Sequence, residues 1–255
     1  EHGVFIPEQR CKYAIEYVAI CNSYCPIRQY LNHCSKQTPH PQWDRIGEIF
    51  LGSPHRIATQ ALQRMMIGAV ARGYTPGCSM SWLPILVGAQ GVGKSMFARN
   101  LVPPSLFAEI TTPLDKLHGE PYRLHTSGWL LELPEIDNFF SIKNIENFKN
   151  LITTRTDEVR MIYENPKKMA RKFVLIGTTN RNQFLLDSTG NRRFVPLEIP
   201  RGFQIPWQQL AQERDALWAA AIKDFQNGVG YEFTSGEIAA VAEYIQEFGE
   251  PDPWT

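Results

Sequence analysis

Residues 82–95 are Trp-Leu-Pro-Ile-Leu-Val-Gly-Ala-Gln-Gly-Val-Gly-Lys-Ser, and this stretch decides the fold. A short apolar run ends in a turn that fits the P-loop pattern G-x-x-x-x-G-K-[ST] at every fixed position. In such a loop the glycines let backbone N–H groups turn toward phosphate oxygens, and the lysine reaches the β- and γ-phosphates. The stretch therefore predicts phosphate binding, and a tight structural turn is the alternative.

The residues around this loop provide the expected context. Ile85-Leu86-Val87 predicts a buried strand, and 95–101 predicts the start of a helix, whose N-terminus favours anions. We expect ATP as the cofactor, with Mg²⁺ held by the hydroxyl of Ser95. The predicted nucleotide-binding residues are consecutive: Gly88, Ala89, Gln90, Gly91, Val92, Gly93, Lys94, Ser95 and Met96.

A second apolar run, 129–133, carries two acids near its end, Glu132 and Glu135. An acid at the end of a buried strand is costly unless it has a partner, and Mg²⁺ is such a partner. We assign Glu132 to the metal and Glu135 to the attacking water, which requires Pro134 to bend the chain between them. The alternative is a pair of surface carboxylates.

Two further stretches complete the predicted site. The strand 173–178 ends in hydroxyl residues and Asn180, which is suited to hold water or the γ-phosphate, or else simply caps the turn. Arg192 and Arg193 precede the last strand, and a planar guanidinium suits a transferring γ-phosphate. The alternative for the arginines is an exposed pair at a strand start.

Apolar periodicity predicts the remaining architecture. Helices are expected over 7–35 with a break at Pro26, over 56–72, from Ser141 onward, and over two segments after Trp207, while 36–55 is expected to be a loop. Strands at 84–87, 128–133, 173–178 and 194–199 alternate with helices, and 156–172 predicts a hairpin. The fold class is α/β, a P-loop sheet with helices on both faces, in three segments: helical 1–81, core 82–200 and helical 201–255.

Composition limits the partners. The 255 residues carry a formal net charge of zero, so any nucleic-acid contact must come from a local patch. The segment from Arg155 to Arg193 contains nine basic and four acidic residues, which gives it a net charge of +5. Five cysteines without a signal peptide or membrane-length apolar run favour the cytoplasm, with buried thiols preferred over a zinc site near Cys21 and Cys25. A start without methionine is consistent with a fragment.

These motifs in this order resemble the virulence-associated protein E family, which is related to the superfamily 3 helicases of phages and mobile elements. The resemblance covers about residue 40 to the end and includes Gly88–Ser95, Trp129–Asp137, Gly177–Asn180 and Asn191–Phe194. It implies an AAA+-like ATPase that forms a ring, expected to be a hexamer, and moves along single-stranded or forked DNA during replication in a bacterial or phage-infected cell. A primase domain, in the same chain or in a partner, is also implied.

The resemblance also implies residue roles. Lys94 and Ser95 would be Walker A, Glu132 and Glu135 Walker B, Asn180 the polar sensor, and Arg192 or Arg193 a finger acting on the neighbouring subunit. The adjacent acidic pair usual in superfamily 3 is split here, which leaves the roles of the two glutamates open. The residues implied to track DNA are basic and lie on or near the predicted hairpin: Lys149, Arg155, Arg160, Lys167, Lys168 and Arg171.

Three functions fit these features. The first is an ATP-hydrolysing DNA helicase or translocase. The second is an ATP-dependent switch or assembly protein that binds nucleotide and partners without unwinding DNA. A small-molecule kinase ranks third, because the segment between the strands is basic and carries no acceptor-site signature.

Overall fold

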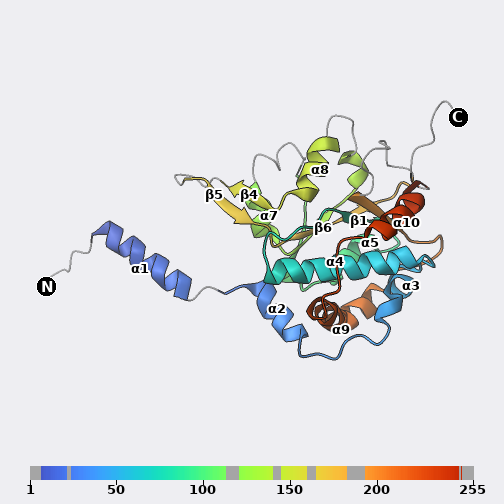
Figure 1. The fold of residues 1–255 in the computed structure, drawn as a ribbon, viewed down its shortest axis with the longest axis horizontal. Helices are drawn as coiled ribbons and strands as arrows, with labels where there is room; N and C mark the ends of the chain where they lie inside the picture. Colours follow the sequence, from blue (N-terminus) through green and yellow to red (C-terminus); the bar gives the residue numbers. More distant parts are fainter. Residues whose placement is uncertain are drawn as a thin grey trace.

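The computed structural model describes residues 7–21, 24–112, 121–139, 145–159, 165–182, 193–246 and 248. Within this part of the chain, helices surround one central sheet, and a two-stranded hairpin stands beside it (Figure 1). This is the α/β class with helices on both faces that the sequence predicts.

The central sheet has five strands in the order β2-β3-β6-β1-β7. Every neighbouring pair is parallel, so the carboxyl ends of all the strands lie at the same edge. The strands are β1 (Leu83–Val87), β2 (Phe107–Glu109), β3 (Leu130–Leu133), β6 (Val174–Thr179) and β7 (Phe194–Glu198). Ligands of open parallel sheets bind outside this edge, where the P-loop follows β1.

Helices form the outer layers of the fold. Helices α4 and α9 pack together below the sheet in the view of Figure 1, and α8 lies above it. The helices are α1 (Glu8–Cys21), α2 (Pro26–Cys34), α3 (Ile46–Leu51), α4 (Arg56–Tyr74), α5 (Lys94–Asn100), α7 (Pro121–Ser127), α8 (Ile145–Thr153), α9 (Trp207–Gln226) and α10 (Ser235–Gln246). Short 3₁₀ turns are η1 (Trp43–Arg45), η2 (Pro104–Leu106) and η3 (Ile136–Phe139).

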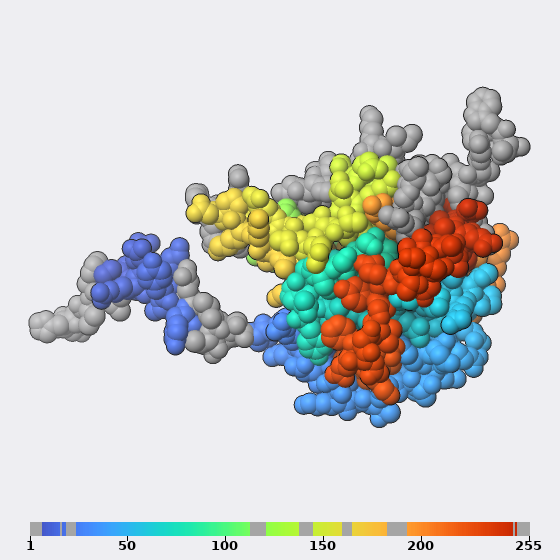
Figure 2. Space-filling model, in the orientation of Figure 1, coloured from blue at the N-terminus to red at the C-terminus, as the bar shows by residue number. Residues whose placement is uncertain are grey.

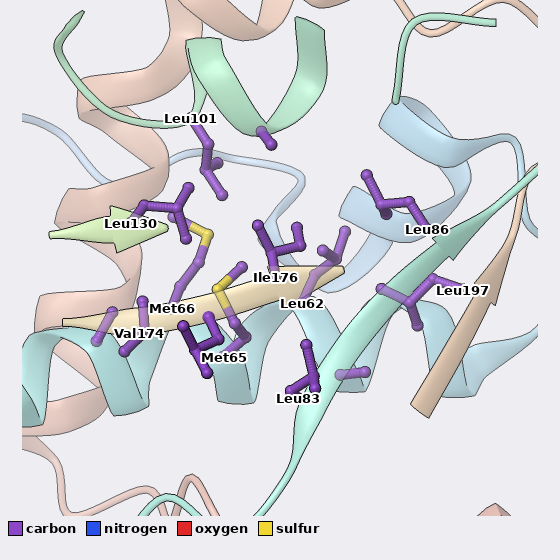
Figure 3. Close-up of a cluster of buried hydrophobic side chains, with 14 of the residues drawn as sticks. Leu62, Met65, Met66, Leu83, Leu86, Leu101, Leu130, Val174, Ile176 and Leu197 are labelled. Atoms are coloured by element: carbon purple, nitrogen blue, oxygen red, sulfur yellow. The ribbon is translucent and has the colours of Figure 1, made fainter. Parts of the chain in front are cut away.

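One hydrophobic core joins all three predicted segments. Leu62, Met65 and Met66 of α4 contribute to the buried cluster with apolar side chains of β1, β3, β6 and β7 (Figure 3). Leu210 and Trp218 of α9 belong to the same core. The predicted boundaries at residues 81 and 200 therefore mark changes of secondary structure within one packed unit.

Helix α1 stands apart from this unit (Figure 2). Its tyrosines Tyr13 and Tyr17 are 60% and 69% exposed, as is usual for side chains outside the core. No helix in the described residues has both the length and the hydropathy needed to cross a bilayer.

The hairpin predicted over 156–172 is present as antiparallel strands β4 (Thr156–Val159) and β5 (Lys167–Ala170), which lie at one side of the molecule (Figure 1). A buried ion pair anchors its base, where Arg171 donates to both carboxylate oxygens of Asp157 at 2.6 Å. His125 of α7 lies 2.8 Å from the same carboxylate, and Arg171 also donates to the carbonyl of Leu151. The network thus ties the hairpin to α7 and α8.

Asp157 is expected to be essential for stability. Burial alone would raise its pKa, but the hydrogen bonds from Arg171 and His125 outweigh burial and lower the pKa to about 2. The folded-state pKa lies below the unfolded value of about 3.9, so the carboxylate stabilises the fold above that pH and loses this contribution as the pH falls through 2. Asp157→Asn should lower the free energy of unfolding at pH 7 by about 3–5 kcal/mol, because it leaves Arg171 buried without a counter-charge.

Urea unfolding provides the measurement. The variant should lose less stability than the wild type between about pH 4 and pH 2, because it no longer carries the titrating carboxylate. The exposed Asp44→Asn is a charge-matched control and should change stability little. Equal stability of the Asp157 variant and the wild type at pH 7 would contradict the assignment.

Several local expectations are confirmed and others are wrong. The second helix expected after Trp207 is present as α10, and a capping box opens it, since Thr234 N and Oγ1 donate to Glu237 at 2.8 and 2.7 Å. The loop expected over 36–55 contains η1 and α3, whose apolar Ile46, Phe50 and Leu51 are buried against the core. Strand β2 and helix α7 were not predicted, because both are short. The helix expected from Ser141 onward is present as α8 from Ile145, and its expected start at Ser141 lies outside the described residues.

Candidate nucleotide-binding site

The P-loop follows β1 at the carboxyl edge of the sheet, as the sequence predicts. Gly91 and Gly93 have φ values of +83° and +98°, a region that side-chain-bearing residues rarely adopt. The loop opens onto a cavity of about 360 Å³ whose lining residues include Gln90, Gly91, Lys94, Ser95, Met96, Glu135 and Asn180. Three sequence-distant predictions, from the loop, the second strand and the sensor strand, thus meet at one cavity.

Lys94 is held at the floor of this cavity. Its ammonium donates to the carbonyls of Gly88 at 2.7 Å and Ala89 at 2.9 Å, and to Oδ1 of Asn180 at 2.7 Å. All three acceptors are neutral, and burial lowers the pKa of Lys94 while the charge of Glu132 raises it. A largely buried cation with only neutral hydrogen-bond partners favours an anion in the adjoining cavity.

Glu132 lies at the end of β3 and is fully buried. Its Oε1 accepts from Ser95 at 2.6 Å and from Thr178 at 3.0 Å, while its Oε2 has no hydrogen-bond partner among the described residues. Burial raises the pKa of Glu132, and the two hydroxyl donors oppose this rise. A buried carboxylate with an unpaired oxygen beside a serine hydroxyl fits a hard divalent cation, so Ser95 and Glu132 are suited to hold Mg²⁺.

Glu135 lies in the turn after β3 and lines the same cavity. Its side chain is exposed, and its φ of +46° is the one positive value of a non-glycine residue in the described part of the chain. Such a conformation costs about 1–3 kcal/mol and persists only where the surroundings enforce it, which is common at functional sites. The turn that begins at Pro134 therefore brings the carboxylate of Glu135 to the cavity, while the carboxylate of Glu132 is buried in the protein.

Arg193, one of the two arginines predicted for the site, is not among the residues that line this cavity. Arg193 directly precedes β7, and Phe194 pairs with Leu83 at the amino end of β1. The P-loop follows the opposite end of β1, about five residues or 16 Å away along the strand. Arg193 lines a different cavity, with Glu232 and Phe233. Arg192 lies outside the described residues.

The basic positions implied to contact DNA divide into two groups. Lys167 and Lys168 on β5 are exposed, and Arg155 is exposed while its Nε donates to the carbonyl of Gly77 at 2.8 Å. Lys149 and Arg171 are instead buried, with 6% and 3% exposure. Arg160 lies outside the described residues.

The two buried residues are bonded within the protein. Lys149 donates to Glu146 at 2.9 Å, and Arg171 belongs to the Asp157 network. Both side chains are buried, and each cation is paired with a carboxylate of the same chain.

Other polar residues near the site were not singled out from the sequence. Thr178 donates to Glu132, and Thr179 donates to Asp137 Oδ1 at 2.9 Å. The available signal was the run of hydroxyl residues that ends the strand before Asn180. A pattern of this kind indicates polar strand ends, but it does not say which carboxylates they meet.

The parallel sheet in this strand order, with a glycine-rich loop and a buried lysine after its β1 strand, defines a P-loop α/β protein. Residues 31–249 match the virulence-associated protein E-like domain, and the chain belongs to that family. The predicted family resemblance is thereby confirmed.

Solved structures support the same fold. One apo structure of the NrS-1 C-terminal region (305–718) has a TM-score of 0.56 and 17% identity, covering 87% of this chain and 55% of that chain. A second, the A form, has a TM-score of 0.54 and 15% identity, covering 87% and 54%. The chain therefore spans about half the length of these structures, and at this identity the likeness concerns the fold alone. No curated protein matches the sequence.

Proposed function

We propose that this protein is an ATP-hydrolysing motor that acts on DNA as a ring of identical subunits during replication of a phage, plasmid or genomic island. The observation that carries the proposal is the convergence of Lys94, Ser95, Glu135 and Asn180 on one cavity, with the buried Glu132 bonded to Ser95. Membership of the virulence-associated protein E-like family and the NrS-1-like fold support it.

Each residue of the site has a role that its position supports. Lys94 balances the charge of the β- and γ-phosphates. Asn180 is in contact with Lys94 and therefore lies beside the expected position of the γ-phosphate. Ser95 and Glu132 would hold Mg²⁺, which would supply positive charge opposite the developing negative charge of the phosphates. Glu135 faces the solvent side of the cavity, where its carboxylate orients the attacking water and accepts its proton.

The site of one chain is incomplete in this proposal. An arginine commonly stabilises the charge of a transferring γ-phosphate, yet none of the residues lining the described cavity is an arginine. Arg193 lies at the opposite edge of the sheet, where it is available to a neighbouring copy. A head-to-tail contact repeated around a ring, expected to be a hexamer, would complete every site in this way.

Mixing two inactive variants tests this geometry. Arg193→Ala and Lys94→Ala should each lack ATP turnover, but an equal mixture should regain activity, because about a quarter of the interfaces in random rings combine an intact P-loop with an intact arginine. Phosphate release after co-assembly is the measurement. Arg201→Ala, at another exposed arginine, is the control and should stay active alone. Absence of rescue at every mixing ratio would argue against Arg193 as the finger.

DNA is expected to stimulate turnover through the hairpin. The double variant Lys167→Ala/Lys168→Ala should weaken DNA binding and reduce the slope of log affinity against log salt by about 1–2, since each lysine that contacts a phosphate releases roughly one counterion. Affinity for single-stranded and forked DNA should be measured by fluorescence anisotropy between about 50 and 200 mM salt.

A charge-matched control uses lysines away from the hairpin. Lys36→Ala/Lys223→Ala removes two exposed lysines from α9 and the segment after α2, and should leave the salt slope unchanged. If no DNA form stimulates turnover by the wild type, a nucleotide-dependent switch replaces the motor as the better function.

A further inference from the structure

The end of β6 organises the candidate site. Three consecutive polar residues there each contact a different part of it: Thr178 donates to Glu132, Thr179 donates to Asp137, and Asn180 accepts from Lys94. Successive side chains of a strand point to opposite faces, so this one strand end reaches both the metal side of the site and the turn that carries Glu135. Of the three residues contacted, Glu132, Asp137 and Lys94, only Asp137 has no role in the proposed hydrolysis.

Asp137 binds the residues on both sides of Asn180. Its Oδ1 accepts from the hydroxyl of Thr179 at 2.9 Å, and its Oδ2 lies 3.1 Å from Nε of Arg181. Thr179 is 1% exposed, whereas the side chain of Arg181 is 71% exposed. The buried hydrogen bond is therefore the stronger contact, because solvent screens an exposed ion pair.

Asp137 also lies two residues after the strained Glu135. Between them, Ile136 is fully buried against β6, where a Cβ added at Gly177 would lie 2.5 Å from Ile136 Cδ1. The turn that carries Glu135 is thus attached to β6 at two points, an apolar contact at Ile136 and a polar contact at Asp137. These two contacts hold the turn in place and so help to keep Glu135 at a φ of +46°, a strained conformation that persists only where the surroundings enforce it.

We propose that Asp137 is a positioning residue that holds Glu135 and Asn180 in a fixed relation across the nucleotide cavity. Asp137 is not among the residues that line the cavity. Asp137 binds Thr179 and Arg181 and so fixes the turn in which Asn180 contacts Lys94. Because Asp137 belongs to η3, the same contacts also fix the backbone that follows Glu135. The inference rests on the proposed ATP hydrolysis for its kinetic consequence, but its structural part concerns the conformation of Glu135 alone.

The kinetic test compares Asp137→Ala with Asp137→Asn. The alanine variant should lower kcat for ATP about 10–100-fold, because small displacements of reacting groups have effects of this size, while the affinity for a non-hydrolysable ATP analogue changes less than about threefold. The asparagine variant keeps an oxygen acceptor for Thr179 and should retain most of the activity. Asp44→Ala, at an exposed aspartate, is the matched control.

A double variant separates positioning from a general loss of folded protein. Adding Asp137→Ala to Glu135→Gln should lower kcat by a smaller factor than Asp137→Ala does in the wild type, because the part of its effect that acts through the Glu135 carboxylate is already lost. Equal losses of kcat and of analogue binding, or full additivity in the double variant, would overturn the proposal.

A second measurement does not depend on turnover. Glu135→Gly relieves a left-handed backbone conformation and should raise Tm by about 1–3 °C in the otherwise wild-type chain. In the Asp137→Ala background the turn is no longer enforced, so the gain should fall by at least half. The same gain in both backgrounds would refute the role of Asp137. A wild type without ATP turnover, combined with a gain that depends on Asp137, would refute the proposed hydrolysis and leave the positioning role supported.

Discussion

Lys94→Ala is expected to abolish ATP turnover, with kcat/KM falling at least about 100-fold, the range found for removal of one charge-stabilising donor from an active site. In the structure its ammonium donates to two loop carbonyls and Asn180, and it is the one lysine or arginine side chain among the described residues that line the cavity. Water can replace the lysine at these acceptors in the open cavity, so the fold should persist. Steady-state phosphate release and nucleotide binding by calorimetry are the measurements.

The matched control is Lys36→Ala, which removes an exposed lysine after α2 and should leave turnover unchanged. Circular dichroism should show the same helical content in both variants. Turnover by Lys94→Ala within twofold of the wild type would mean that the cavity does not bind the phosphates as proposed.

Glu135→Gln is expected to bind ATP but hydrolyse it about 10²–10⁴-fold more slowly, the usual effect of removing a general base. The exposed carboxylate lines the cavity but is separated from Glu132, which lies buried beneath it. Loss of its charge should therefore affect proton transfer and leave nucleotide affinity nearly unchanged. Single-turnover hydrolysis with saturating enzyme separates chemistry from binding.

Two further variants sharpen this experiment. Glu243→Gln, at an exposed glutamate of α10, should behave as wild type. Glu132→Gln should instead raise the Mg²⁺ concentration needed for half-maximal turnover, because Glu132 is the carboxylate bonded to Ser95. If Glu135→Gln raises the Mg²⁺ requirement and Glu132→Gln does not, the two roles are exchanged.

Much of the site was predictable because its signals are local. The order of glycines, lysine and serine in residues 88–95 specifies a turn, a buried cation and a hydroxyl without reference to the rest of the chain. The apolar runs before Glu132 and Asn180 predict buried strands, and parallel strands place their carboxyl ends at one edge. Local pattern and sheet geometry together therefore account for the meeting of these three motifs.

Burial of charged residues was not predictable in the same way. Lys149 and Arg171 lie on or near the predicted hairpin, and the family resemblance implied that they contact DNA. Their carboxylate partners, Glu146 and Asp157, are three and fourteen residues away. Whether a guanidinium faces solvent or a buried carboxylate depends on where the hairpin packs, and α7, which supplies His125, was not predicted.

Local residue patterns were sufficient to predict the P-loop, the strands that bring Glu132 and Asn180 to it, and the family to which the chain belongs. Only the tertiary structure decided that Glu132 is buried against Ser95 while Glu135 faces the cavity in a strained turn. It also separated Arg193 from its own P-loop and joined Asp137 to Thr179. The physical reason is that a spacing pattern fixes local backbone geometry, whereas burial, hydrogen-bond partners and distance across the sheet depend on residues far apart in the chain.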